Sequence, residues 1–463
     1  MDVVRANAWT GSAALVGPDI DPESPWGLSA RAFSSRPSIK LLLPGAPPDD
    51  RDWTHPKVGW GLVMPDDDAL SDADKASGED APGPIKKLRA VRKDAPILRY
   101  RAGSMNGYLR RYFTDGRGAS DLDVSASRTG IGEDEIPKYL LIYGGPKKIP
   151  WRTQYALNMS RCVGRLHLEG DALERYVEHL IGIWPGVECN PLAPVVWSVN
   201  FGEADITCLM QQVIADKFWK DIVADADFAK AIRLADGAAT GAALADAMAT
   251  HPGLILTTSH GMTGPEQKPG SEPDQIGLPV DANHALLSSA VLPDAAIPGG
   301  AIWYAHACCS AGADANSQCA DLFPAGNAIG DTLRAVSANA GDCVAPLAGR
   351  LLGADKPLRA FIGHVEPTFD WMLRDPNTKQ AVGAVLADAL YGQLYQKGMP
   401  VGLALSKVYS QAGSFLTLWR QAIDAVNKDA PGSAELARYW QVAALDRQGI
   451  VVLGDPTVTL PLK

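Results

Sequence analysis

The chain has 463 residues, of which 46% are hydrophobic and 21% are charged, and its formal net charge is −10. This length allows two or three domains or one large α/β unit with additions, and the acidic balance argues against nucleic-acid binding as the main function. Seven cysteines without CxxC spacing indicate neither a disulfide framework nor a zinc site, and the lack of a bilayer-length apolar run or a secretion signal predicts a cytoplasmic protein without membrane contact.

The first 130 residues are rich in proline, glycine and aspartate and show little periodicity. Short apolar runs at 41–43 and 59–64 predict two strands. Residues 65–92 are acidic first and basic at the end, with almost nothing to bury, so we expect a solvated loop there, with a protease-sensitive linker as the alternative. The segment 1–130 is therefore predicted to be an irregular N-terminal extension that contains this acidic loop.

From residue 131, buried-strand patterns alternate with helical ones. The first set comprises strands at 138–143, 162–166 and 194–199 and helices at about 171–183 and 206–223. These elements predict a first, non-catalytic α/β subdomain over residues 131–238.

The same alternation continues over residues 239–463. The predicted elements are a helix at 239–250, strands that begin at 254 and 301, a helix at 325–338, a strand at 359–363, helices at 378–397 and 401–426, and a strand at 450–453. Residues 261–283 are rich in glycine and proline and predict a mobile loop. Strands that alternate with helices imply βαβ units, so we expect an α/β fold with a mainly parallel sheet.

A histidine and a cysteine each directly follow one of these strands. His260 and Gly261 follow the strand that begins at 254, and Cys308 and Cys309 follow the next strand, 308 − 260 = 48 positions later. Sites in open α/β sheets gather at the carboxyl ends of strands, so we expect the imidazole and a thiol to lie side by side. His260 could take the thiol proton and later protonate a leaving amine, with Gly261 and Cys308 supplying oxyanion-hole N–H groups. Taken singly, each could instead be an ordinary core residue.

These motifs resemble those of caspase-like (clan CD) cysteine peptidases. The resemblance rests on Ser259-His260-Gly261 and on His306-Ala307-Cys308-Cys309-Ser310. On that alignment Cys308 is the nucleophile and Cys309 the runner-up. The chain is also similar to gingipain-like peptidases at 139–144, 162–166 and 453–456, and to CHAT-type peptidases and separases at 359–367.

The resemblance covers about residues 136–463. It implies a caspase-like, three-layer α/β/α fold with two βα subdomains, of which 239–463 is the catalytic one. It further implies a thiol endopeptidase that needs no metal or other cofactor to cleave the bond.

The resemblance also implies a substrate pocket. In the related separases, acidic side chains in the loop that matches 364–371 help bind an arginine at P1, and here that loop offers Glu366 and Asp370. Trp371 could stack on the substrate, and His306 stands where many members have an acidic residue or glutamine. Because a carboxylate pairs well with guanidinium or ammonium groups, we expect a lean towards Arg or Lys at P1, unless both carboxylates are merely solvated.

The expected function is cleavage of a protein or peptide substrate, regulated by an activator protein or by processing. No nucleic acid or membrane partner is expected. The alternative is a catalytically weak, peptidase-like scaffold that binds protein partners through residues 1–130. A small-molecule hydrolase is disfavoured because we find no Gly-x-Ser-x-Gly elbow at a strand-to-helix turn.

Overall fold

The computed structural model describes residues 3–9, 14–18, 47–103, 107–265, 267–320, 323, 326, 328–370, 373–375 and 378–462. The chain forms two compact units, Met1–Pro47 and Pro48–Lys463. In the first unit, β1 (Val3–Trp9) and β2 (Ala14–Pro18) pair antiparallel. The strand predicted at 41–43 lies outside the described residues.

The second unit is built on one sheet of twelve strands. In order across the sheet these are β12 (Ile232–Ala235), β11 (Val195–Ser198), β13 (Leu254–Thr258), β14 (Ile302–His306), β17 (Ala360–His364), β18 (Ile450–Gly454), β10 (Cys162–Leu166), β9 (Tyr139–Tyr143), β3 (Trp60–Pro65), β4 (Ile97–Tyr100), β5 (Tyr108–Arg111) and β6 (Ser120–Asp123). Neighbours are parallel except at β17–β18, β4–β5 and β5–β6. The predicted α/β class with a mainly parallel sheet is confirmed.

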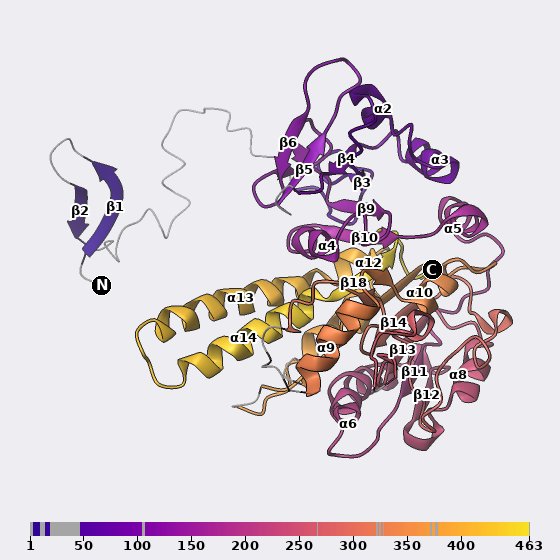
Figure 1. The fold of residues 1–463 in the computed structure, drawn as a ribbon. Helices are drawn as coiled ribbons and strands as arrows, with labels where there is room; N and C mark the ends of the chain where they lie inside the picture. Colours follow the sequence, from indigo (N-terminus) through magenta and orange to yellow (C-terminus); the bar gives the residue numbers. More distant parts are fainter. Residues whose placement is uncertain are drawn as a thin grey trace, which may run out of the picture. The chain divides into compact units, whose positions relative to one another are not determined.

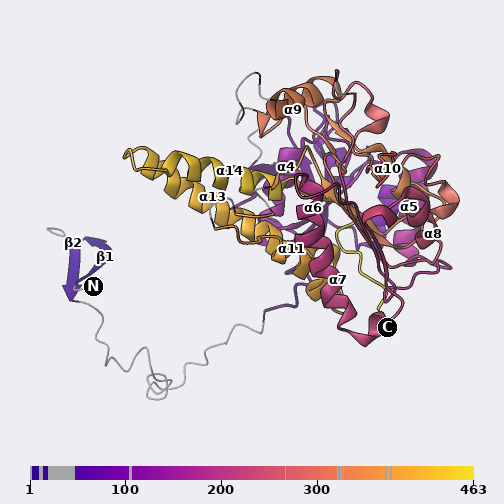
Figure 2. The same ribbon diagram turned by 90° about the horizontal axis from the view of Figure 1, so that it is seen from below.

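Helices cover both faces of this sheet. The described helices of the second unit are α2 (Asp72–Ser77), α3 (Gly83–Val91), α4 (Trp151–Asn158), α5 (Gly170–Gly182), α6 (Ile206–Met210), α7 (Asp216–Val223), α8 (Gly241–Met248), α9 (Ala328–Asn339), α10 (Pro346–Leu352), α11 (Ala384–Asp388), α12 (Val401–Ala404), α13 (Ser406–Val426) and α14 (Ser433–Gln448). Figure 2 shows α5, α8 and α10 on one side of the sheet and α6, α7 and α11 on the other. The three layers α/β/α are therefore present as predicted.

The strands at the centre of the sheet are buried on both faces. All five residues of β13 and all five of β14 are buried, which is why both segments read as near-continuous apolar runs. The helix predicted at 206–223 is also present, as α6, a π-helical turn at Gln211–Ala215 and α7. Figure 1 shows α13 and α14, packed together, reaching away from the sheet. No helix among the described residues has both the length and the apolar character required to cross a bilayer.

The segment 48–130 is not the irregular extension that its composition predicted. The strands β3, β4, β5 and β6 extend the same sheet, and the expected acidic loop at 65–92 contains α2 and α3. The boundary predicted at residue 238 also cuts across the sheet, because β11 and β12 lie beside β13 rather than beside β9 and β10.

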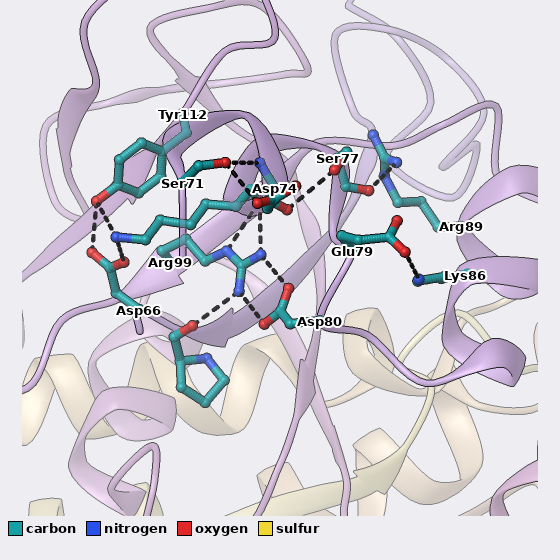
Figure 3. Close-up of polar contacts among 12 residues, drawn as sticks. Asp66, Ser71, Asp74, Ser77, Glu79, Asp80, Lys86, Arg89, Arg99 and Tyr112 are labelled. Carbon is teal, nitrogen blue, oxygen red and sulfur yellow. Dashed lines mark hydrogen bonds and ion pairs between the residues drawn. The ribbon is translucent and has the colours of Figure 1, made fainter. Parts of the chain in front are cut away.

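Buried cations explain why the acidic segment folds (Figure 3). The fully buried Arg99 of β4 donates to both carboxylate oxygens of Asp80, at 2.7 and 2.8 Å, and to the backbone carbonyl of Lys75. The Lys75 ammonium lies 2.8 Å from Asp66, which also accepts a hydrogen bond from the Tyr112 hydroxyl at 2.9 Å. Arg99 and Lys75 neutralise these two carboxylates, of which Asp66 is buried and Asp80 is partly exposed, and the contacts hold α2 against the sheet.

Asp455, directly after β18, ties several elements together. Its carboxylate accepts hydrogen bonds from the Trp60 indole at 3.0 Å and from the Thr457 backbone N–H at 2.8 Å, and it lies 3.4 Å from the Arg92 guanidinium. Asp455 is fully buried, and only 9% of Arg92 is exposed. Because Asp455 is buried among these partners, we expect its substitution to destabilise the fold strongly.

The Asp455→Asn variant is expected to lower the free energy of unfolding by about 3–5 kcal/mol, because Arg92 then stays buried without its carboxylate. Urea unfolding followed by tryptophan fluorescence measures this. The control is Asp388→Asn, which removes an ion pair with Lys407 (2.9 Å) whose side chains are 43% and 57% exposed, so a much smaller shift is expected. Equal shifts in the two variants would contradict the assignment.

Candidate active site

The register of the sheet places His260 opposite Cys308. Strands β13 and β14 pair in parallel as far as Thr258 and His306, whose numbers differ by 306 − 258 = 48. His260 and Cys308 each lie two positions beyond this pair and are separated by the same 48 positions. The spacing of 48 between His260 and Cys308 therefore equals the register offset between β13 and β14.

A tight turn separates the two adjacent cysteines. The Ser310 N–H donates to the carbonyl of Ala307 at 3.2 Å, and Cys309 adopts a left-handed conformation with φ of 57°. Cys309 is fully buried against an apolar cluster that includes Ile276, whereas Cys308 is half-buried and lines a cleft. Of the two candidate thiols, the structure brings only Cys308 to the cleft that His260 lines.

This cleft has a volume of about 1190 Å³. His260, Gly261 and Cys308 line it at the carboxyl edge of the sheet, and further walls come from α6, from α9 and from residues 367–370. The sheet edge thus gathers the imidazole, the glycine and the thiol on one surface, as the sequence predicts.

Asp205, which sequence analysis did not single out, holds the imidazole. Its Oδ2 lies 2.9 Å from Nε2 of His260, and its Oδ1 accepts the Thr207 N–H at 2.8 Å as the N-cap of α6. Burial acts to raise the pKa of Asp205, but hydrogen bonds from Thr207 and His260 outweigh it and the pKa is lowered. A signal was available, because a carboxylate stands directly before the predicted helix at 206 and beyond the end of the strand at 194–199.

Burial and hydrogen bonding have opposite effects on the pKa of the Cys308 thiol. Burial raises its pKa above the ordinary value, although the Thr368 backbone N–H, 3.4 Å from the sulfur, and the Gly261 backbone N–H both act to lower it. The unliganded thiol is therefore protonated at neutral pH, and its thiolate requires a base.

Gly261 packs directly on the backbone of Cys308. A Cβ at position 261 would lie 1.9 Å from the carbonyl oxygen and 2.8 Å from the nitrogen of Cys308. Because real Cβ atoms do not approach so closely, only glycine fits here without moving the backbone at Cys308.

The Gly261→Ala variant is expected to lower the peptidase activity that is proposed below by about 100-fold, because the clash displaces Cys308 and the N–H at 261 by a fraction of an ångström or more. Peptide hydrolysis and alkylation of Cys308 by iodoacetamide are the measurements. Gly349→Ala, at a glycine of α10 with open space for a Cβ, is the control. Unchanged activity in Gly261→Ala would show that the close approach has no role in the site.

Of the four residues predicted for the substrate pocket, Glu366 and His306 do not line the cleft. Glu366 is 7% exposed and its carboxylate accepts the Gln318 N–H at 3.3 Å; burial raises its pKa to about 7. Asp370 is exposed and lines the cleft, whereas Trp371 lies outside the described residues. Of the two candidate carboxylates, the structure thus brings Asp370 to the cleft and withdraws Glu366 from it.

His306 belongs to a buried polar cluster rather than to a substrate pocket. It is fully buried, and its Nδ1 lies 2.7 Å from the Tyr304 hydroxyl and 3.1 Å from Nε2 of His364. Burial lowers the pKa of His306 to about 3, so the imidazole is neutral. The expectation that His306 contacts substrate is corrected for this reason: it points into the packed interior, where the neutral ring is hydrogen-bonded.

The loop at 261–283 folds back beside the cleft. The Met262 N–H donates to the carbonyl of Leu278 at 2.9 Å, and the Gly277 N–H donates back to Met262 at 2.8 Å. The Asn339 amide of α9 donates to the carbonyl of Pro269 at 2.6 Å. These hydrogen bonds hold the loop to itself and to α9.

All seven cysteines are free. In the described part of the chain, no group of three or more His, Cys, Asp or Glu side chains is placed to hold a metal ion.

Comparison with known proteins gives distant structural likenesses. No family model and no curated protein matches the chain. The crystal structure of the Arg-specific cysteine proteinase gingipain R (RgpB) is 13% identical with a TM-score of 0.40, and the match covers 88% of this chain and 79% of that one. A complex of the Porphyromonas gingivalis RgpB pro- and mature domains is 13% identical with a TM-score of 0.37, and the match covers 87% of this chain and 80% of that one. A structure described only as a protease is 11% identical with a TM-score of 0.45, and the match covers 88% of this chain and 79% of that one. At these TM-scores the likeness does not assign a function.

Proposed function

We propose that the chain is a cysteine endopeptidase with a His260–Cys308 dyad. The observation that carries the proposal is the meeting of three groups in one cleft: the Cys308 thiol, the His260 imidazole held through Nε2 by Asp205, and the glycine at 261. This combination supplies a nucleophile, a base and a residue that orients the base.

The roles in the proposed reaction follow from the hydrogen bond between Nε2 of His260 and Asp205. Because Asp205 occupies Nε2, Nδ1 of His260 is the acceptor for the Cys308 proton; no hydrogen bond joins Nδ1 to another described residue. The thiolate attacks the scissile carbonyl carbon, and backbone N–H groups of Gly261 and Cys308 stabilise the oxyanion. His260 then donates the proton to the leaving amine, which gives an acyl-enzyme. Water adds to the thioester with His260 as base and releases the acid and the free thiol.

For the substrate we infer a polypeptide with a lean towards Arg or Lys at P1. Asp370 supports this preference, because it is the exposed carboxylate at the loop that the resemblance points to. Arg374 and Lys379 also line the cleft, and their positive charges weaken the preference for a basic P1 side chain. Regulation by an activator or by processing is part of the proposal, because an endopeptidase that is always active would cleave proteins without control.

The test combines a fluorogenic peptide library varied at P1 with labelling by an irreversible peptidyl warhead. Cleavage and labelling by the wild type, both absent in Cys308→Ala, are the expected result. Loss of the Arg/Lys preference in Asp370→Asn, with activity on other peptides kept, is expected for the P1 assignment. Absence of both labelling and cleavage, also after limited proteolysis of the chain, would favour the peptidase-like scaffold.

A further inference from the structure

His260 is contacted on its flat face as well as at its edge. The Phe201 ring lies nearly parallel to the imidazole, with centroids 5.8 Å apart and an interplanar angle of 10°. A single hydrogen bond from Nε2–H to the Asp205 carboxylate leaves the ring able to swivel about the line between the two atoms. A stacked neighbour removes that freedom, because offset parallel stacking favours one orientation of the ring plane.

Phe201 is itself held in place from two directions. The exposed His284 stacks on it with centroids 4.3 Å apart at 17°, and the Phe201 backbone N–H donates to the hydroxyl of Thr207 at 3.0 Å. In the same loop, the Asn200 side chain accepts the Gly202 N–H at 2.9 Å. The loop between β11 and α6 therefore has a defined shape.

Thr207 joins the two residues that touch His260. Its hydroxyl accepts from Phe201 and donates to Oδ1 of Asp205 at 2.6 Å, and the side chain is fully buried. One hydroxyl thus fixes the hydrogen-bonding carboxylate and the stacking ring relative to each other.

We propose that Phe201 and Thr207 are positioning residues for His260: Thr207 locks the β11–α6 loop so that Asp205 holds the edge of the imidazole while Phe201 holds its plane. This inference rests on the proposed function, in which Nδ1 of His260 must face the Cys308 sulfur and then the leaving amine. A base that swivels spends part of its time misaligned, and small misalignments are costly in rate.

The test uses matched variants at each position. Thr207→Val removes the hydroxyl at nearly constant volume, and Thr207→Ser restores it; Phe201→Leu removes the aromatic ring, and Phe201→Tyr restores it. We expect kcat to fall about tenfold or more in Thr207→Val and about two- to tenfold in Phe201→Leu, with KM little changed and with recovery in the conservative partners. Thr417→Val on α13, whose hydroxyl only donates to the carbonyl of Gly413, is the control.

A second readout needs no peptide. The pH dependence of Cys308 alkylation and the NMR titration of the His260 ring both report on the imidazole itself. The charged and titratable side chains that line the cleft with it are Glu203, Asp205, Cys208, Cys308, Asp370, Arg374 and Lys379, and His284 stacks on Phe201. We expect both profiles to shift in Thr207→Val and Phe201→Leu and to return in Thr207→Ser and Phe201→Tyr.

The outcomes separate this inference from the proposed function. Shifted profiles in a chain that cleaves no peptide would support the positioning role and count against the peptidase. A cleaving chain whose kcat and pH profiles are unchanged in Thr207→Val and Phe201→Leu would overturn the positioning role and leave the peptidase standing. A fall in kcat that matches the thermal destabilisation of each variant, without a shift in either profile, would likewise overturn it.

Discussion

The Cys308→Ala variant is expected to lose peptide hydrolysis by about 10⁴- to 10⁶-fold while keeping its fold. Cys308 lines the cleft together with His260. Its replacement by alanine removes the sulfur atom that attacks the scissile carbonyl in the proposed reaction. Hydrolysis of the best fluorogenic peptide and labelling by a peptidyl warhead, each beside a thermal melt, are the measurements.

The neighbouring cysteine provides the control. Cys309 is fully buried against Ile276 and Val336, so Cys309→Ala is expected to cost some stability and to leave the thiol in the cleft reactive. If Cys309→Ala abolishes labelling and Cys308→Ala does not, the nucleophile lies one residue further along and the turn at 307–310 has another conformation in the active protein.

The Asp205→Asn variant is expected to lower kcat by about 10³- to 10⁴-fold. The carboxylate at 2.9 Å from Nε2 keeps the imidazole proton on that nitrogen, which leaves Nδ1 as a base. An amide at the same position can donate to Nε2 and so transfer the proton to Nδ1, where it blocks the reaction. ¹⁵N chemical shifts of the His260 ring measure the tautomer directly, and kcat and KM are measured in parallel.

Asp205 also caps a helix, so its control must make the same change at an N-cap aspartate that does not touch the imidazole. Asp225 fits, because its carboxylate accepts the Asp227 N–H at 3.0 Å at the start of a 3₁₀ turn. Asp225→Asn is expected to leave the tautomer and kcat unaltered. A normal tautomer in Asp205→Asn, or an equal fall of kcat in both variants, would refute the orienting role.

The central half of the fold could be read from local patterns. Near-continuous apolar runs mark β9, β10, β11, β13, β14, β17 and β18, because strands buried on both faces have no polar face to break the run. In the N-terminal part the same reasoning failed. Residues 65–92 are charged, and their local composition contains no information about Arg99 of β4, whose buried guanidinium neutralises Asp80.

The residues of the candidate site also differ in whether the sequence pattern predicts them. His260 and Cys308 were accessible to sequence reasoning because each directly follows a strand and because the 48 positions between them equal the register offset of two adjacent strands. Phe201, Asp205 and Thr207 were not found. Phe201 and Asp205 contact His260, and Thr207 hydrogen-bonds to both of them; this arrangement depends on β11 lying beside β13. The order of strands in a sheet is a long-range property that no local pattern encodes.

The sequence by itself determined the α/β class, most strand ends and the candidate dyad, because buried strands and the residues that leave them have strong local signatures. Only the tertiary structure decided which thiol meets the cleft, which of the proposed pocket residues reach it, and which carboxylate contacts the imidazole. Those outcomes depend on the direction of one turn at 307–310 and on the burial of Glu366 and His306. Both arise from packing between segments far apart in the chain, where desolvation and close contact rather than local propensity set the lowest free energy.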